Sequence, residues 1–275
     1  MAKEIVDSLI REVNINASLS CDYTVSIRGY YIEPQPCIVL ELMHQGSLKD
    51  LLHDQNKVLD WNIRYKFIQS IAKGVAFLIS RRILHRDLKS LNILVNEHNQ
   101  CKLSDFGLSK QKSGPNNPNN NNITAATTAA QIGTYKWMPP EIINELPFTN
   151  KADIYSLGIV IWEISSRQLL SATIPQVIQG KREAIPADCP AKVRVLIESC
   201  RDIEPNNRPA AEQIVKYLNT GSINEYDINL LLPNNQNIID EQDCLASING
   251  LIGNNLQSVA AFNNNKMMLN LVAWQ

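Results

Sequence analysis

The stretch from Ile83 to Leu108 decides the fold of this chain. It begins Ile-Leu-His-Arg-Asp-Leu-Lys-Ser-Leu-Asn-Ile-Leu-Val and, after a polar turn, continues Cys-Lys-Leu-Ser-Asp-Phe-Gly-Leu. Ile93–Val95 and Cys101–Leu103 are short apolar runs, and the residues from 96 to 100 between them are polar. Two such runs joined by a polar turn predict a β-hairpin.

Polar residues at the ends of this hairpin supply the chemistry that phosphoryl transfer requires. Asn92 and Asp105 offer oxygen ligands of the kind that suit a hard cation such as Mg²⁺. Asp87 can accept a proton, and Lys89 can neutralise the charge of a phosphate group. The competing interpretation is an ordinary polar hairpin without a catalytic role.

The composition is that of a globular protein. The chain has 275 residues, of which 44% are hydrophobic and 19% charged, and its formal net charge is −1. This length is enough to bury one or two sizeable cores. The near-neutral charge gives no electrostatic reason to expect nucleic acid or an anionic membrane as a partner.

Cysteine usage and hydropathy favour a cytoplasmic location. The six cysteines lack the spacing of a metal site or of a disulfide framework, so we expect reduced thiols. The first residues include acidic side chains and no long apolar run, so no signal peptide is expected. No apolar run approaches the ~20 residues that span a bilayer, so no membrane partner is expected either.

Two motifs in the deciding stretch resemble those of the protein kinases. The kinase catalytic loop is matched by His85-Arg86-Asp87-Leu88-Lys89-Ser90-Leu91-Asn92, and the metal-binding loop by Asp105-Phe106-Gly107. The resemblance implies that Asp87 accepts the proton of a substrate hydroxyl and that Lys89 steadies the transferred phosphoryl group. It also implies ATP as the phosphate donor, with Mg²⁺ held by Asn92 and Asp105.

The resemblance predicts an α+β protein kinase-like fold with a mainly helical large lobe and a reduced small lobe. Residues 3–19 have apolar side chains at helical spacing, and residues 24–32 and 37–42 are rich in β-branched and aromatic residues. These segments correspond to helix C and the fourth and fifth strands of the small lobe. Glu12 then stands at the helix C glutamate, although an exposed helical carboxylate is the alternative.

The resemblance also assigns the nucleotide contacts. Leu40 falls at the position that guards the back of the pocket. Glu41 and Met43 belong to the hinge, whose backbone binds adenine in this family. Leu94, in the hairpin, is placed with the same nucleotide-binding residues.

The chain departs from the family in the part that covers ATP. No G-x-G-x-x-G string occurs upstream of Glu12, and Lys3 stands at the start of the predicted helix rather than on a third strand. The resemblance therefore predicts a kinase domain truncated on its N-terminal side. Without a third strand beside it, the segment from 37 to 42 becomes an exposed sheet edge that invites pairing with another chain.

The large lobe is matched in family order by four further blocks. Its docking loop and Ala-Pro-Glu motif correspond to Gly-Thr-Tyr-Lys-Trp-Met-Pro-Pro-Glu (133–141), in which Pro139 replaces the alanine. The resemblance gives structural or regulatory roles to Arg86, Phe106, Thr134, Glu141, Asp153 and Arg208. Among these, Asp153 opens the central helix that anchors the catalytic loop, and Arg208 pairs with Glu141. Lys89 and Thr134 indicate a serine/threonine type, and Trp137 and Trp162 favour the tyrosine kinase-like branch.

We expect a kinase-like domain over residues 1–220, with a small lobe and hinge at 1–43 and a large lobe at 44–220. Residues 111–131 are an Asn- and Thr-rich insert where the activation loop belongs, too poor in apolar residues to fold as a core. Its threonines are either phosphate acceptors that engage Arg86 or part of an insertion without a regulatory role. Residues 221–275 form a tail whose order the sequence does not decide.

These observations leave three interpretations of the function. The favoured one is a serine/threonine-type kinase homologue that is inactive or severely impaired and binds protein partners, because the groups that position ATP are missing. The alternative is an active serine/threonine kinase that modifies a protein substrate, with the missing lobe present in a longer chain or supplied by a scaffold partner. A metal-binding or interaction module unrelated to phosphoryl transfer is a third, weaker interpretation.

Overall fold

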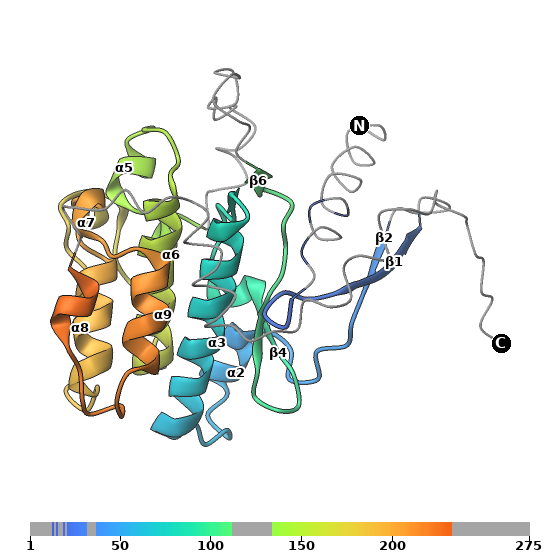
Figure 1. Cartoon of the computed structure of the whole chain (residues 1–275), viewed down its shortest axis with the longest axis horizontal. Helices are drawn as coiled ribbons and strands as arrows, with labels where there is room; N and C mark the ends of the chain where they lie inside the picture. The colour runs from blue at the N-terminus through green and yellow to red at the C-terminus, as the bar shows by residue number, and fades with distance from the viewer. Residues whose placement is uncertain are drawn as a thin grey trace.

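The computed structural model describes residues 13, 15, 19, 21–31, 37–111 and 134–232, the last two residues before the 112–133 gap through their backbone alone. A group of helices forms the larger part, and a two-stranded ribbon extends away from it (Figure 1). This is the expected α+β arrangement, with a helical lobe that carries most of the buried residues and a small β part. Glu12, Lys3 and the threonines of the insert lie outside the described residues.

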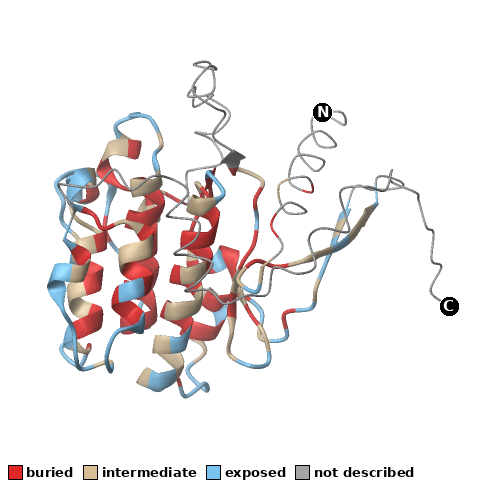
Figure 2. Ribbon diagram, viewed as in Figure 1, coloured by how far each residue is buried: buried red, intermediate tan, exposed pale blue. Residues whose placement is uncertain are grey.

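Two buried helices form the centre of the helical lobe. Helix α3 spans Trp61–Ser80, and Asp60 caps it by accepting a hydrogen bond from the Ile63 N–H at 2.9 Å. Helix α6 spans Asn150–Ser166 and is buried along almost its whole length (Figure 2). It packs against α3 on one side and against α8, Ala191–Cys200, on another, while α9, Ala211–Asn219, packs on α3. A helix that is apolar all round must be enclosed in this way.

The predicted hairpin is confirmed. Strand β4 covers Ile93–Val95 and pairs antiparallel with β5, Cys101–Leu103, so that Ile93 lies opposite Leu103. Strand β5 packs on α3, which buries the apolar side of the hairpin. Beyond the ladder, the Ser104 N–H donates to the Asn92 carbonyl at 2.9 Å. This pairing brings Asn92 next to the segment that carries Asp105.

Strands β1, Ile27–Tyr31, and β2, Cys37–Leu40, form an antiparallel ribbon shorter than the predicted strands. The Val25 N–H donates to the Leu103 carbonyl at 2.9 Å, which ties the base of the ribbon to the hairpin. In the described part of the chain β2 pairs only with β1, and Val39 and Leu40 are 41% and 39% exposed. The expected exposed edge strand is therefore present (Figure 2).

Shorter elements complete the helical lobe. Helix α2, Leu48–His53, is capped by Ser47, whose hydroxyl accepts a bond from the Asp50 N–H at 3.1 Å. The remaining elements are β3 Ile83–Leu84 paired with β6 Lys110–Gln111, η1 Ser90–Asn92, η3 Tyr135–Trp137, α5 Pro140–Ile143, α7 Ile174–Ile178, η4 Pro205–Asn207 and η5 Ile228–Leu231.

The described chain continues to pack on the lobe as far as residue 232. Leu231, in η5, is buried, and the Lys192 ammonium donates to the carbonyls of Thr220 and Ser222. Residues 233–275 lie outside the described residues, so the domain limits given above stay predictions. The five cysteines of the described residues are free thiols, as expected. Among the described residues, no helix is long and apolar enough to cross a membrane.

Candidate active site

Helix α6 holds the catalytic loop through a buried carboxylate near its N-terminus. Asp153 accepts hydrogen bonds from the backbone N–H groups of His85 at 2.8 Å and Arg86 at 3.0 Å. Burial raises the pKa of the Asp153 carboxyl, and the neighbouring charges and N–H donors oppose that rise. Arg86 adopts a left-handed backbone conformation, φ 69°, so the chain turns sharply just before Asp87.

Within the described part of the chain, only one of the two carboxylate oxygens of Asp87 is hydrogen-bonded. Its Oδ2 accepts bonds from the Lys89 ammonium at 2.7 Å and from the Asn92 amide at 2.9 Å. Its Oδ1 is buried and has no hydrogen-bond partner among the described residues. A buried oxygen without a partner is costly in a folded protein and often marks a functional site. This oxygen is available to a hydroxyl group that enters the site.

Lys89 links the catalytic loop to the segment from 134 to 138. Its ammonium donates to the Thr134 hydroxyl at 3.2 Å as well as to Asp87. The lysine is largely buried, with 16% of its side chain exposed. The predicted pair of catalytic residues and Thr134 therefore lie together.

The predicted metal ligands have donor atoms whose chemistry suits Mg²⁺. The Asn92 amide nitrogen donates to both the backbone carbonyl and the side chain of Asp87, so the amide oxygen faces away from that pair. Asp105 is exposed and left-handed, φ 61°, with its Oδ1 3.4 Å from the Gly107 N–H. No group of three or more His, Cys, Asp or Glu side chains in the described ranges could hold a metal. Mg²⁺ commonly takes only one or two protein oxygens and completes its shell with water and phosphate.

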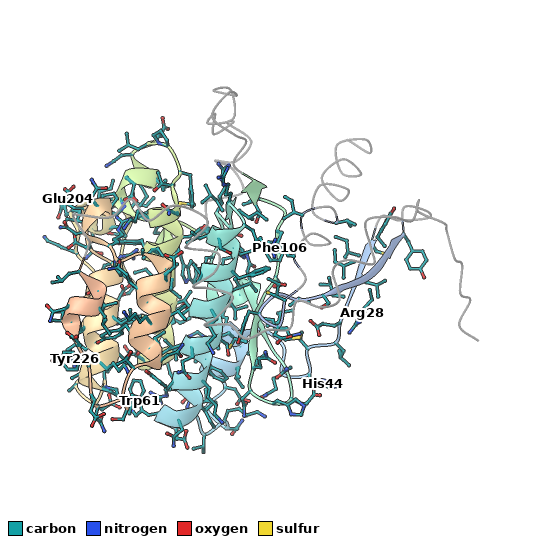
Figure 3. All side chains as sticks on the ribbon, in the orientation of Figure 1. Arg28, His44, Trp61, Phe106, Glu204 and Tyr226 are labelled. Carbon is teal, nitrogen blue, oxygen red and sulfur yellow. The ribbon has the colours of Figure 1, made fainter. Side chains whose placement is uncertain are left out.

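Phe106 packs under the catalytic loop. Its side chain is fully buried, and its ring centroid lies 5.3 Å from that of His85. In Figure 3 it lies between the helical lobe and the β1–β2 ribbon. The Ser109 hydroxyl donates to the His85 carbonyl at 3.1 Å, which ties His85 to the segment that follows Phe106. His85 thus contacts Phe106 through its ring and Asp153 through its backbone N–H.

The segment predicted to be the hinge has backbone groups that make no backbone hydrogen bond within the described ranges. The Glu41 N–H donates to the Ser26 carbonyl at 2.9 Å, and the Met43 carbonyl accepts from the Gly46 N–H at 3.1 Å. No backbone hydrogen bond within the described ranges uses the Glu41 carbonyl or the Met43 N–H. Leu94 is half-buried in the neighbouring strand. Of the four predicted nucleotide contacts, Leu40, Glu41 and Met43 lie at the end of β2 and just after it, and Leu94 lies in β4. Leu40 is exposed to solvent.

Glu41 also makes an ion pair that the sequence did not suggest. Its carboxylate accepts from the Lys102 ammonium at 2.7 Å and from the Ser26 N–H at 2.8 Å. These two bonds lower the pKa of Glu41 although partial burial opposes them. Because Lys102 lies in β5, the pair joins the hinge to the strand that leads into Asp105.

Arg208 and Glu141 form the predicted buried pair. The guanidinium donates to both carboxylate oxygens, at 2.6 and 2.9 Å, and its side chain is fully buried. It also donates to the carbonyls of Asp202 and Lys151, at 2.8 and 2.9 Å. The pair fixes the end of the segment that begins at Thr134.

Two further side chains in this region were not predicted. Glu163, in α6, accepts bonds from the Ser90 hydroxyl at 2.9 Å and from the Trp137 indole N–H at 2.6 Å. Arg182 donates to the carbonyls of Lys136 and Met138, at 2.8 and 3.3 Å. An acid within the apolar run from Leu157 to Ile164 was a visible signal for Glu163, but nothing in the sequence identified its partners.

Arg86 lies against an aromatic ring of the helical lobe. Its guanidinium carbon lies 5.6 Å from the centre of the Phe148 ring, and its Nε is buried without a hydrogen-bond partner in the described part of the chain. Burial lowers its pKa. A contact with a phosphorylated insert stays a prediction, since the insert lies outside the described residues.

Comparison with known proteins agrees with this geometry. Residues 1–218 match the family model described as protein tyrosine and serine/threonine kinase. The chain is 34% identical over 232 residues to the probable serine/threonine-protein kinase drkD of Dictyostelium discoideum, covering 81% of this chain and 17% of drkD. It is 36% identical over 226 residues to the probable serine/threonine-protein kinase drkA of the same organism, covering 78% of this chain and 34% of drkA.

A plant relative shows the same relationship. The chain is 34% identical over 193 residues to the serine/threonine-protein kinase STY17 of Arabidopsis thaliana, covering 68% of this chain and 32% of STY17. It spans about a third or less of the length of these curated relatives. With the catalytic loop, the metal-binding loop and the Arg208–Glu141 pair in place, the chain belongs to the protein kinase family, among relatives of the serine/threonine type.

Proposed function

We propose that this chain is a serine/threonine-type kinase homologue of the tyrosine kinase-like branch, inactive or severely impaired in phosphate transfer as residues 1–275. The observation that carries the proposal is an asymmetry of the site. Asp87 is bonded to Lys89 and Asn92, which supports a catalytic loop with its polar groups in place, yet Val39 and Leu40 beside the predicted hinge are exposed and no Gly-rich string precedes Glu12 within residues 1–275. The roles that remain are those of a kinase-like protein that binds a protein substrate or a scaffold partner.

The assembled half of the site supports phosphoryl transfer to a hydroxyl. The free Oδ1 of Asp87 suits acceptance of a hydrogen bond, and then the proton, from a serine or threonine hydroxyl. Lys89, 2.7 Å from Asp87, is close enough to balance charge on a transferred phosphoryl group. Asn92 and Asp105 would hold Mg²⁺, which when bound neutralises phosphate charge.

The uncovered half explains the expected impairment. Kinase catalysis consists mainly of positioning and charge stabilisation, so a nucleotide that is not held in place reacts slowly. The described residues near the hinge offer the Glu41 carbonyl and the Met43 N–H for adenine. Residues 21–31 and 37–42, the described part on the β1–β2 side, contain no lysine that could hold the phosphates. We therefore expect weak binding of Mg·ATP.

An active serine/threonine kinase is the second candidate. The intact set of Asp87, Lys89, Asn92 and Asp105 favours it, because an enzyme without activity has no need to keep all four groups in register. In that case a longer chain or a partner supplies the missing strands. We expect a cytoplasmic protein with neither nucleic acid nor a membrane as its partner.

Thermal melting and phosphate transfer separate the two candidates. We expect residues 1–275 to melt at the same temperature with and without Mg·ATP, whereas a tight binder would be stabilised by several kcal/mol at saturating nucleotide. Transfer of labelled phosphate to a serine- and threonine-rich protein should stay at background. A rise in melting temperature that Asp105→Asn removes, with transfer that Asp87→Asn removes, would establish the active kinase instead. The matched control is Asp22→Asn, an exposed aspartate outside the site.

A further inference from the structure

Glu163 joins two loops that are distant in the sequence. One carboxylate oxygen accepts from the Ser90 hydroxyl at 2.9 Å, and the other accepts from the Trp137 indole N–H at 2.6 Å. Ser90 lies 73 residues before Glu163 and Trp137 lies 26 residues before it. The carboxylate, which belongs to α6, therefore connects the catalytic loop (residues 85–92) with the docking segment (residues 134–138).

The burial of Glu163 makes these two bonds significant. Glu163 is 2% exposed and lies in the C-terminal half of α6, among buried residues that are mostly apolar. A buried carboxylate without hydrogen-bond donors would be strongly disfavoured. Ser90 and Trp137 are the hydrogen-bond donors to this carboxylate within the described residues. Each loop is thus held to α6 by a group whose removal would leave the acid short of a partner.

Both loops carry functional residues next to these contacts. Ser90 directly follows Lys89, and Trp137 lies within one short turn of Thr134. Lys89 and Thr134 are themselves 3.2 Å apart, so the two loops also meet at the site. A shift of either loop on α6 would change the position of the lysine relative to the threonine.

Other contacts hold only one of the two loops. The Ser156 hydroxyl donates to the Trp137 carbonyl at 2.9 Å, and Arg182 donates to the carbonyls of Lys136 and Met138. Arg182 also donates to the Tyr155 hydroxyl at 2.8 Å and lies over its ring at 5.2 Å. These groups fix the backbone of the docking segment without touching the catalytic loop, which makes Arg182 a suitable comparison for Glu163.

We propose that Glu163 is a positioning residue that couples the catalytic loop to the docking segment by binding Ser90 and Trp137 on one carboxylate. Loosening one loop then loosens the other through α6. The coupling concerns the order of the two loops and stands whether or not the chain transfers phosphate. Only its relevance to a protein substrate rests on the proposed function.

Hydrogen–deuterium exchange on the full chain tests the coupling without nucleotide or substrate. Trp137→Phe keeps an aromatic ring and removes the indole donor. We expect about fivefold to tenfold faster exchange in residues 87–92 as well as in 134–138, the change that accompanies loss of one hydrogen bond of ordinary net strength. Ser90→Ala should produce the reciprocal effect and speed exchange in 134–138. Slowly exchanging amides of α3 report any loss of global stability, and the change in each loop is compared with the change in α3.

Arg182→Met is the matched control, because it frees the Lys136 and Met138 carbonyls without touching Glu163. We expect its effect to be confined to the docking segment. If Trp137→Phe and Ser90→Ala each alter only their own loop, as Arg182→Met does, the coupling is refuted.

Kinetics give a second readout if residues 1–275 transfer phosphate. Glu163→Gln, which keeps the size and one acceptor, should then raise KM for the protein substrate and leave KM for ATP unchanged. A failure of transfer in the unmodified chain tells against an active kinase and leaves the exchange result intact. Loss of the reciprocal exchange effect overturns the coupling even in an active enzyme.

Discussion

Gly158 and Cys200 meet where α6 crosses α8, and a Cβ on Gly158 would lie 2.7 Å from the Cβ of Cys200. Real side chains do not approach so closely, so the two helices pack at this distance only because residue 158 has no side chain. Gly158→Ala should therefore lower the free energy of unfolding by about 1–3 kcal/mol, measured by urea denaturation. Cys200→Gly in the same chain should restore part of the loss. Gly29→Ala, which has open space around its Cβ, is the control. Equal stability of Gly158→Ala and the parent would contradict the packing.

The Arg208–Glu141 pair should be costly to break from one side. Arg208 is fully buried and donates to both oxygens of Glu141, at 2.6 and 2.9 Å. Glu141→Gln would leave a buried guanidinium without its countercharge, and we expect a loss of about 3–5 kcal/mol in urea unfolding. Glu97→Gln, at an exposed pair with His44, should leave the unfolding midpoint unchanged. A similar midpoint for both variants would show that Arg208 is satisfied by its carbonyl partners alone.

The anchor of the catalytic loop should weaken when Asp153 loses one acceptor. Its two oxygens each take a backbone N–H, from His85 and Arg86. An asparagine offers one oxygen and places an NH₂ group against the second N–H. Asp153→Asn should lower stability by about 1–3 kcal/mol and speed hydrogen exchange at residues 85–87. Asp60→Asn, at an exposed helix cap where asparagine is an equally good cap, is the matched control. Unchanged exchange at 85–87 would argue against the anchoring role.

The stability of the chain should carry a pH dependence from Glu163. Burial raises its pKa from 4.5 to about 7, against the opposing hydrogen bonds of Trp137 and Ser90, with Lys49 lowering and Glu183 raising it. Because the folded chain then binds a proton that the unfolded chain releases, stability falls as pH rises between about 5 and 7 and levels off above. The shift corresponds to at most about 3 kcal/mol. Other groups titrate in this range too, so the difference from a matched variant isolates Glu163.

Urea midpoints of the parent and of Glu163→Gln, measured from pH 5 to pH 8, give that difference. Relative to Glu163→Gln, the parent should lose stability as pH rises through this window. A constant difference between the two curves would mean that Glu163 does not titrate there.

Much of the fold and of the site could be predicted from local sequence. Ser47 and Asp60 cap their helices through bonds to backbone N–H groups three residues on, and such local contacts can be recognised in a sequence. The hairpin from Ile93 to Leu103 also forms as predicted. Its two apolar strands and the polar turn between them follow one another directly in the sequence, so the pattern can be recognised locally. Asp87, Lys89 and Asn92 lie within six residues of one another, so their contacts follow once the loop is fixed.

Contacts between distant segments could not be predicted in the same way. Glu163 and Arg182 reach partners 26 to 73 residues away, and no spacing or periodicity reports such a distance. The ion pair of Glu41 with Lys102 likewise joins the segment after β2 to β5, and the packing of these two segments depends on the whole fold. Residues whose role depends on tertiary packing were therefore the ones that sequence reasoning missed.

Transfer of labelled phosphate from Mg·ATP to a serine- and threonine-rich protein is the most direct test of the central claim. Residues 1–275 and their Asp87→Asn variant should be measured side by side at saturating nucleotide. If the catalytic half of the site is assembled but the nucleotide is not held, both proteins give the same background rate. A rate for the parent chain at least tenfold above that of Asp87→Asn would contradict this account and make the chain an active kinase.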